Sequence, residues 1–132
     1  MRCAVRALLL AVVPLVAGCS LFRDPRVSVA DIAFISAPDT VRADSVLGFT
    51  VHADLGHHSE FVLDHVDTSR SSSQFEIRVW SRDVSRKGYA TLHVVTRAEL
   101  TYQAYPAESG SYHIIGHQPD GSTTKKTITV LP

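Results

Sequence analysis

Apolar and polar residues alternate along most of the chain after residue 26, with the period of two that is typical of β-strands with one buried face. Residues 45–55 show this pattern best, because every second residue from Leu47 to Leu55 is apolar and most residues between them are polar or small. No stretch of this region keeps a helical period over several turns. The pattern predicts seven strands, at 27–35, 45–55, 60–66, 74–80, 89–98, 111–117 and 123–131.

Turn-forming residues separate the predicted strands, and each break contains Pro, Gly, Asp or Ser residues that favour chain reversal. The breaks lie near 37–39, 56–58, 69–73, 86–88, 106–110 and 119–121. Short strands that alternate with turns in this way are typical of a sandwich of two sheets. The sequence therefore predicts an all-β fold, a single antiparallel β-sandwich that occupies residues 27–132.

The first 18 residues have the features of a secretory signal peptide. A positive start with Arg2 and Arg6 is followed by the apolar run 7–16 and then by small residues. This run is shorter than the roughly 20 apolar residues that a membrane-spanning helix needs. We therefore expect export of the chain and removal of residues 1–18.

The sequence Val16-Ala17-Gly18-Cys19 at the end of the signal resembles the bacterial lipobox. The resemblance implies cleavage before Cys19 and attachment of a diacylglycerol to its thiol, with acyl chains such as palmitate. It also implies that Ser20 favours sorting to the outer membrane. Residues 19–26 would then be the lipidated cysteine and its tether. The alternative is an ordinary signal peptide followed by a chance cysteine.

Charge and cysteine content narrow the possibilities further. The chain has 13 basic and 13 acidic residues, a balance that argues against electrostatic capture of nucleic acid. Loss of two arginines with the signal lowers the 13 basic residues to 11 against 13 acidic ones, so the mature protein is mildly acidic. Cys3 is lost with the signal and Cys19 carries the lipid, so we expect no disulfide. The hydrophobic core must then stabilise the domain.

The stretch 108–114, Glu-Ser-Gly-Ser-Tyr-His-Ile, resembles the Asp-x-Gly-x-Tyr-x-Cys stretch of immunoglobulin domains. In that family the tyrosine forms a corner before the sixth strand, so the resemblance implies that Tyr112 faces the core. Ile114 stands where the family has its core cysteine. The resemblance therefore implies a disulfide-free immunoglobulin-like sandwich, with the first, second, fourth and fifth predicted strands in one sheet. A sandwich of another topology is the alternative.

A looser resemblance is to small uncharacterised bacterial lipoproteins with immunoglobulin-like domains. It rests on Pro38-Asp39-Thr40-Val41-Arg42-Ala43, before the second strand, and on Thr127-Ile128-Thr129-Val130, near the end of the chain. This resemblance implies a fold and a location in the cell envelope. It supplies no activity.

Histidine is the one residue type in excess, with seven in the chain. Neutral imidazole binds Zn²⁺ or Cu²⁺, and a few convergent histidines are enough for a site. In an immunoglobulin-like layout three or four of five histidines would meet, and the five candidates are His57, His58, His65, His113 and His117. Their spacing matches no metal-binding motif, so ordinary exposed histidines are the alternative and no resident cofactor is expected.

Trp80 is the other unusual residue. In the predicted strand 74–80 the alternation places the apolar residues inward and Trp80 outward, on the same face as Arg78. The immunoglobulin-like layout adds His52 and His93 to this outer face. An exposed tryptophan near an arginine is typical of a binding hot spot. A bulge that turns Trp80 back to cover the core is the alternative.

The sequence contains no recognisable catalytic motif, because it has neither a Gly-x-Ser-x-Gly elbow nor a phosphate-binding loop and its carboxylates are scattered singly. We therefore expect that the protein is not an enzyme. The main hypothesis is a lipid-anchored, non-catalytic binding module of the bacterial envelope, whose partner is a protein, peptidoglycan or another glycan and not a nucleic acid. The alternative is a periplasmic metal-binding lipoprotein that uses its surface histidines.

Overall fold

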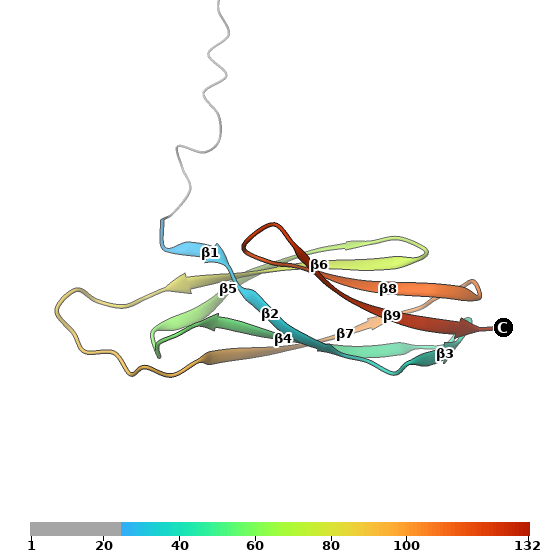
Figure 1. The fold of residues 1–132 in the computed structure, drawn as a ribbon, viewed down its shortest axis with the longest axis horizontal. Coiled ribbons are helices and arrows are strands. Elements are labelled where there is room, and N and C mark those ends of the chain that lie inside the picture. Colours follow the sequence, from blue (N-terminus) through green and yellow to red (C-terminus); the bar gives the residue numbers. More distant parts are fainter. Residues whose placement is uncertain (1–24) are drawn as a thin grey trace, which may run out of the picture.

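The computed structural model describes residues 25–132, and these residues form nine β-strands (Figure 1). The strands are β1 (Val27–Val29), β2 (Asp31–Ser36), β3 (Thr40–Arg42), β4 (Leu47–Gly56), β5 (Phe61–Arg70), β6 (Gln74–Asp83), β7 (Thr96–Ala104), β8 (Gly110–His117) and β9 (Thr123–Leu131). The predicted all-β fold is therefore confirmed. No helix able to cross a membrane is found within residues 25–132. The lipobox and Cys19 lie outside the described residues.

The strands form two sheets that lie one above the other (Figure 1). The three-stranded sheet has the order β2-β4-β7 and is antiparallel throughout. The six-stranded sheet has β5 at one edge, next to β6, and continues through β8 and β9 to β3. β1 pairs with residues 80–82 of β6 and β8 pairs with residues 74–77, so both strands lie along the same edge of β6.

The hydrophobic core fills the space between the two sheets. Every second residue of β4 from Leu47 to Leu55 is buried, and so are the alternate residues of β6 that begin at Phe75. The rings of Phe49 and Phe75 meet edge to face between the layers, with their centroids 5.0 Å apart. Interdigitated inward side chains from two facing sheets define a β-sandwich, as the alternation predicted.

Tyr112 and Ile114 of β8 both lie in this core, as the resemblance to immunoglobulin domains implied. Burial of the Tyr112 phenol raises its pKa above the usual value. On the other face of β8, His113 and Ile115 are partly exposed. The alternation along this strand was therefore predicted in the correct register.

The predicted assignment of strands to sheets is wrong. The fourth predicted strand, β6, belongs to the six-stranded sheet and not to the sheet of β4 and β7. It pairs in parallel with β8. The first predicted strand is split at Ala30, because β1 pairs with β6 whereas β2 pairs with β4 in the other sheet. Alternation fixes which face of a strand is buried, but it does not select the neighbouring strand.

The strand predicted at 89–98 is also misplaced. The fifth long strand, β7, begins at Thr96, and residues 84–95 form a loop. Ala98, Leu100 and Tyr102 of β7 pack against the core, whereas the apolar residues of the loop do not. Both stretches alternate, so the period alone could not locate this strand. The β5–β6 hairpin is longer than predicted and extends from Phe61 to Asp83.

Candidate functional site

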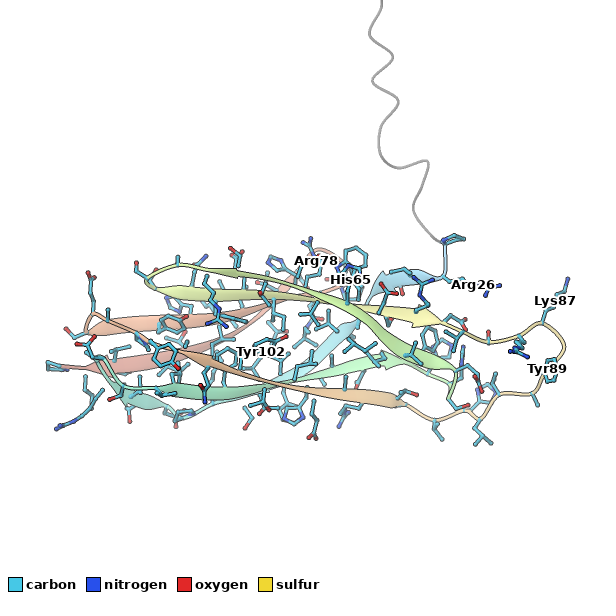
Figure 2. All side chains as sticks on the ribbon, turned by 180° about the vertical axis from the view of Figure 1, so that it is seen from behind. Arg26, His65, Arg78, Lys87, Tyr89 and Tyr102 are labelled. Carbon is cyan, nitrogen blue, oxygen red and sulfur yellow. The ribbon has the colours of Figure 1, made fainter. Side chains whose placement is uncertain are left out.

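Trp80 lies on the outer face of the six-stranded sheet, as the alternation along β6 predicted. Phe75, Ile77 and Val79 are buried, whereas Arg78 is exposed and Trp80 is partly exposed. The alternative, a bulge that turns Trp80 into the core, does not occur. Figure 2 shows Arg78 and the neighbouring His65 on this outer side, while Tyr102 lies between the layers.

Two side chains of β5 hold the indole of Trp80 in place. The Trp80 Nε1 group donates a hydrogen bond to Asp67 Oδ2 at 2.8 Å. The imidazole of His65 stacks on the indole, with centroids 5.4 Å apart and planes 12° from parallel. A register shift between Leu63 and His65 brings His65 directly opposite Trp80. The bulge therefore sits in β5, where it aims a ring at Trp80, and not in β6.

Asp64 connects His65 to Arg82. Its Oδ2 lies 2.5 Å from His65 Nδ1, and its Oδ1 accepts a hydrogen bond from Arg82 Nε at 2.7 Å. The hydrogen bonds from His65 and then Arg82 lower the pKa of the Asp64 carboxyl below its usual value. We call this connected group the Trp80 cluster, and its members are Asp64, His65, Asp67, Trp80 and Arg82. Its hydrogen bonds, together with the stack of His65 on Trp80, fix the orientation of the two rings.

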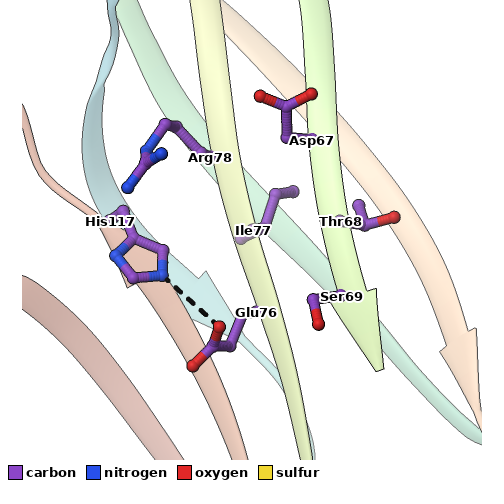
Figure 3. A pocket seen from close by; sticks show the side chains of 7 residues that line it. All are labelled: Asp67, Thr68, Ser69, Glu76, Ile77, Arg78 and His117. Carbon is purple, nitrogen blue, oxygen red and sulfur yellow. Dashed lines mark ion pairs between the residues drawn. The ribbon is translucent and has the colours of Figure 1, made fainter. Parts of the chain in front are cut away.

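An open depression of about 260 Å³ adjoins the Trp80 cluster on the same face (Figure 3). Its lining residues are Asp67, Thr68, Ser69, Glu76, Ile77, Arg78 and His117. Asp67 belongs to both the cluster and the depression, so the two are continuous. His117 Nε2 lies 3.7 Å from Glu76 Oε2, and this pair forms one wall. The lining offers carboxylates, a guanidinium and hydroxyls, which suits a polar ligand that both donates and accepts hydrogen bonds.

His52 and His93 do not lie on this surface, so the predicted grouping of four binding residues is wrong. His52 lies on the outer face of the three-stranded sheet, where it stacks on Phe34 with centroids 4.0 Å apart and lies 3.5 Å from Glu99. His93 is exposed in the loop between β6 and β7. The reason is the sheet assignment, since β4 and β6 belong to different sheets whose outer faces point away from each other.

The histidines proposed as metal ligands are separated along the fold. His57 and His58 adjoin each other in the turn after β4, and His58 Nε2 lies 3.5 Å from Asp83. His113 and His117 share the outer face of β8, but β6 lies between β8 and the strand that carries His65. Among the described residues, no group of three or more His, Cys, Asp or Glu side chains is arranged to hold a metal ion.

Two residues that the sequence does not connect with Trp80, His65 and Asp67, contact it in the structure, and Glu76 and His117 line the adjoining depression. His65 and His117 were considered only as metal ligands, and Asp67 and Glu76 only as isolated carboxylates. A usable signal was present, because Asp64, His65 and Asp67 follow one another closely in a strand adjacent to β6 in sequence. Only the pairing of β5 with β6 shows which of these side chains meets the indole.

Comparisons with protein-family models, with curated proteins and with solved structures find no match for this chain. The chemistry of the outer face must therefore be interpreted from its own residues. The outer face thus combines an ordered, partly exposed tryptophan with an open polar depression. The stacked rings and the carboxylates of β5 and β6 supply both a hydrophobic contact and hydrogen-bonding groups.

Proposed function

We propose that this protein is a bacterial envelope lipoprotein, anchored through a lipid on Cys19, whose sandwich binds peptidoglycan without catalysing a reaction. The sequence Val16-Ala17-Gly18-Cys19 after a short apolar run supports the anchor. Ser20 supports a location at the outer membrane. The proposal includes that the anchored domain faces the periplasm, the compartment that contains peptidoglycan.

The observation that carries the binding role is the fixed orientation of Trp80 beside the open depression. An indole that is held by Asp67 and His65 loses little freedom on binding, so less of the interaction energy is spent on ordering it. Tryptophan and arginine are also the residue types that dominate binding energies at interfaces. Arg78 is exposed and lies close to this indole on the same strand.

The lining of the depression favours peptidoglycan over a purely apolar partner. Ser69 offers a hydroxyl, and Asp67 and Glu76 offer carboxylates to the hydroxyl and amide groups of amino sugars. The guanidinium of Arg78 suits the carboxylates of the stem peptides. The partly exposed indole of Trp80 suits the apolar face of a sugar ring. One open depression can therefore contact both parts of the polymer.

Binding is tested with the soluble form, residues 20–132, and isolated peptidoglycan sacculi. Every buried apolar residue of the described part lies between Ala30 and Val130, so this form retains the core. We expect it to sediment with sacculi, and we expect Arg78→Ala to weaken this binding about tenfold. Arg42→Ala is the matched control, because Arg42 is also exposed but lies on β3, away from the depression. A soluble form that stays in the supernatant, or equal losses in both variants, would overturn the peptidoglycan assignment.

The anchor is tested separately in cells. If Cys19 is acylated, the membrane fraction should contain the mature protein with an N-terminus at residue 19 and the mass of the attached acyl chains. Cys19→Ser should abolish this modification and the membrane retention. An unmodified N-terminus after residue 19 in the native protein would show that the signal is an ordinary one.

A further inference from the structure

The loop between β6 and β7, residues 84–95, projects beyond the end of the sandwich (Figure 1). Its tip carries Lys87 and Tyr89, which point away from the two layers (Figure 2). The loop exposes five large apolar side chains: Val84, Tyr89, Leu92, Val94 and Val95. Tyr89 is 73% exposed and Leu92 is 70% exposed. An exposed apolar group of this size on a small domain marks a contact surface.

The base of the loop is tied to the turn between β4 and β5. Val84 N donates to Glu60 O at 2.8 Å, and Ser59 N donates to Leu92 O at 3.0 Å. Beyond these bonds the chain reverses in a turn closed by Tyr89 N and Arg86 O at 3.1 Å, with Gly88 at a φ of 89°. The fixed base holds the apolar side chains away from the core of their own domain.

Two further apolar residues extend the exposed group at this end of the sandwich. Val62 and Leu63, at the start of β5, are exposed and pair with residues 81 and 82 just before the loop. The start of the described chain lies at the same end of the sandwich, because β1 pairs with residues 80–82 and Asp83 N donates to Arg26 O at 2.9 Å. The loop and the start of the domain are therefore neighbours.

The loop 84–95 contains basic residues and no acidic ones. Arg86 and Lys87 lie at its tip, and the sequence contains no acidic residue between Asp83 and Glu99. Within residues 25–132 neither cation has an ion-pair partner, whereas Arg97, just after the loop, pairs with Asp54 at 2.8 Å. The domain as a whole is mildly acidic, so this positive charge is concentrated beside the exposed apolar side chains. Cations next to apolar and aromatic groups are the composition of segments that bind anionic bilayers.

We propose that the loop 84–95 is a membrane contact that inserts Tyr89 and Leu92 into the interface of an anionic bilayer. Arg86 and Lys87 meet the lipid phosphates in this arrangement. The affinity of the loop for lipid follows from its own residues, whereas its orientation in the cell rests on the proposed anchor at Cys19. A tether of residues 20–26 spans at most about 25 Å, so the neighbouring loop reaches the same bilayer. The loop then limits rotation of the domain and keeps one orientation relative to the membrane.

The test measures binding of the unlipidated soluble form, residues 20–132, to vesicles. We expect it to bind vesicles that contain phosphatidylglycerol and to bind pure phosphatidylcholine vesicles much more weakly. The double substitution Tyr89→Ser and Leu92→Ser should weaken binding to the anionic vesicles about tenfold or more. The double substitution Arg86→Ser and Lys87→Ser should weaken it by a similar factor. In this second variant, vesicle binding should also no longer depend on the salt concentration.

The matched control substitutes two exposed apolar residues at the opposite end of the sandwich. Val46 is 52% exposed and Tyr105 is 62% exposed, so Val46→Ser with Tyr105→Ser removes a comparable apolar surface. This control should bind as the unsubstituted form does. Absence of binding to anionic vesicles, equal binding to both kinds of vesicle, or equal losses in loop and control variants would each overturn the proposal. Because sacculi contain no bilayer and this form has no lipid, failure here is distinct from failure of the peptidoglycan or anchor assignments.

Discussion

Asp67 Oδ2 accepts a hydrogen bond from Trp80 Nε1 at 2.8 Å, although these residues are not direct partners in the β5–β6 ladder. The partner of Trp80 is His65, and the partner of Asp67 is Arg78. The bond is therefore diagonal, and with the His65 stack it holds the indole from two directions. These contacts make Trp80 an ordered surface residue, and its energetic role should differ from that of a core aromatic.

The first prediction compares Trp80 with a buried aromatic residue of the same strand. Trp80→Ala should lower the free energy of unfolding by about 1–2 kcal/mol, because it removes one hydrogen bond and partly exposed packing. Phe75→Ala should cost about 3–5 kcal/mol, because Phe75 is fully buried. Urea unfolding followed by circular dichroism measures both. Equal costs would mean that Trp80 belongs to the core and is no binding residue.

The second prediction concerns adjacent isoleucines on opposite faces of β8. Ile114 is 0% exposed, so Ile114→Ala should cost about 2–5 kcal/mol through lost burial and the cavity left behind. Ile115 faces outward and is partly exposed, so Ile115→Ala should cost about 1 kcal/mol or less. Chemical denaturation of the two variants gives the comparison. A larger loss at Ile115 would refute the register of β8 in the sandwich.

The third prediction uses two glycines of β4. A Cβ at Gly56 would overlap the ring of Phe61, so Gly56→Ala should destabilise the domain by about 1–3 kcal/mol. A Cβ at Gly48 meets open space, so Gly48→Ala should stabilise it by about 0.5–1 kcal/mol. Melting temperatures should therefore move in opposite directions. Similar shifts at both positions would show that Phe61 does not cover Gly56.

The fourth prediction follows from the lowered pKa of Asp64, which His65 and Arg82 cause by hydrogen bonding. A carboxyl whose pKa is lower in the folded state stabilises the fold at pH values above its unfolded pKa of about 3.9. This stabilisation is lost as the pH falls through the pKa of the folded state. The difference in melting temperature between the unsubstituted protein and Asp64→Asn should therefore shrink as the pH falls below the unfolded value.

The control for the pH experiment is Asp31→Asn. The carboxylate of Asp31 is exposed and makes no side-chain hydrogen bond within the described part of the chain. Its substitution should leave the acid limb of the stability profile unchanged. If Asp64→Asn and Asp31→Asn follow the same profile, the bonds to His65 and Arg82 do not hold the carboxylate of Asp64 in its charged form.

Features that depend on one strand alone were predictable from the sequence. The outward direction of Trp80 and the inward direction of Tyr112 follow from the period of two within their own strands. The β7 strand was misplaced because the loop before it also alternates, and the apolar residues of that loop are exposed. Nothing in the period itself distinguishes an apolar residue that covers a core from one that faces solvent.

Features that depend on neighbouring strands were not predictable. His52 was grouped with Trp80 because their strands were assigned to one sheet, whereas β4 and β6 lie in different layers. His65 meets the indole only because a register shift follows Leu63, and a shift of one residue would turn His65 to the other face. The grouping of Trp80 with His65 and Asp67 therefore depends on strand pairing, which composition and residue spacing alone do not reveal.

Fluorescence of Trp80 tests the proposed binding role most directly, because Trp80 is the only tryptophan in the chain. The soluble form is titrated with soluble peptidoglycan fragments while the emission of the indole is recorded. We predict a saturable change in emission whose midpoint rises about tenfold in Arg78→Ala and is unchanged in Arg42→Ala. An emission spectrum that stays constant up to about 1 mM fragments, or midpoints that agree in the two variants, would contradict the account.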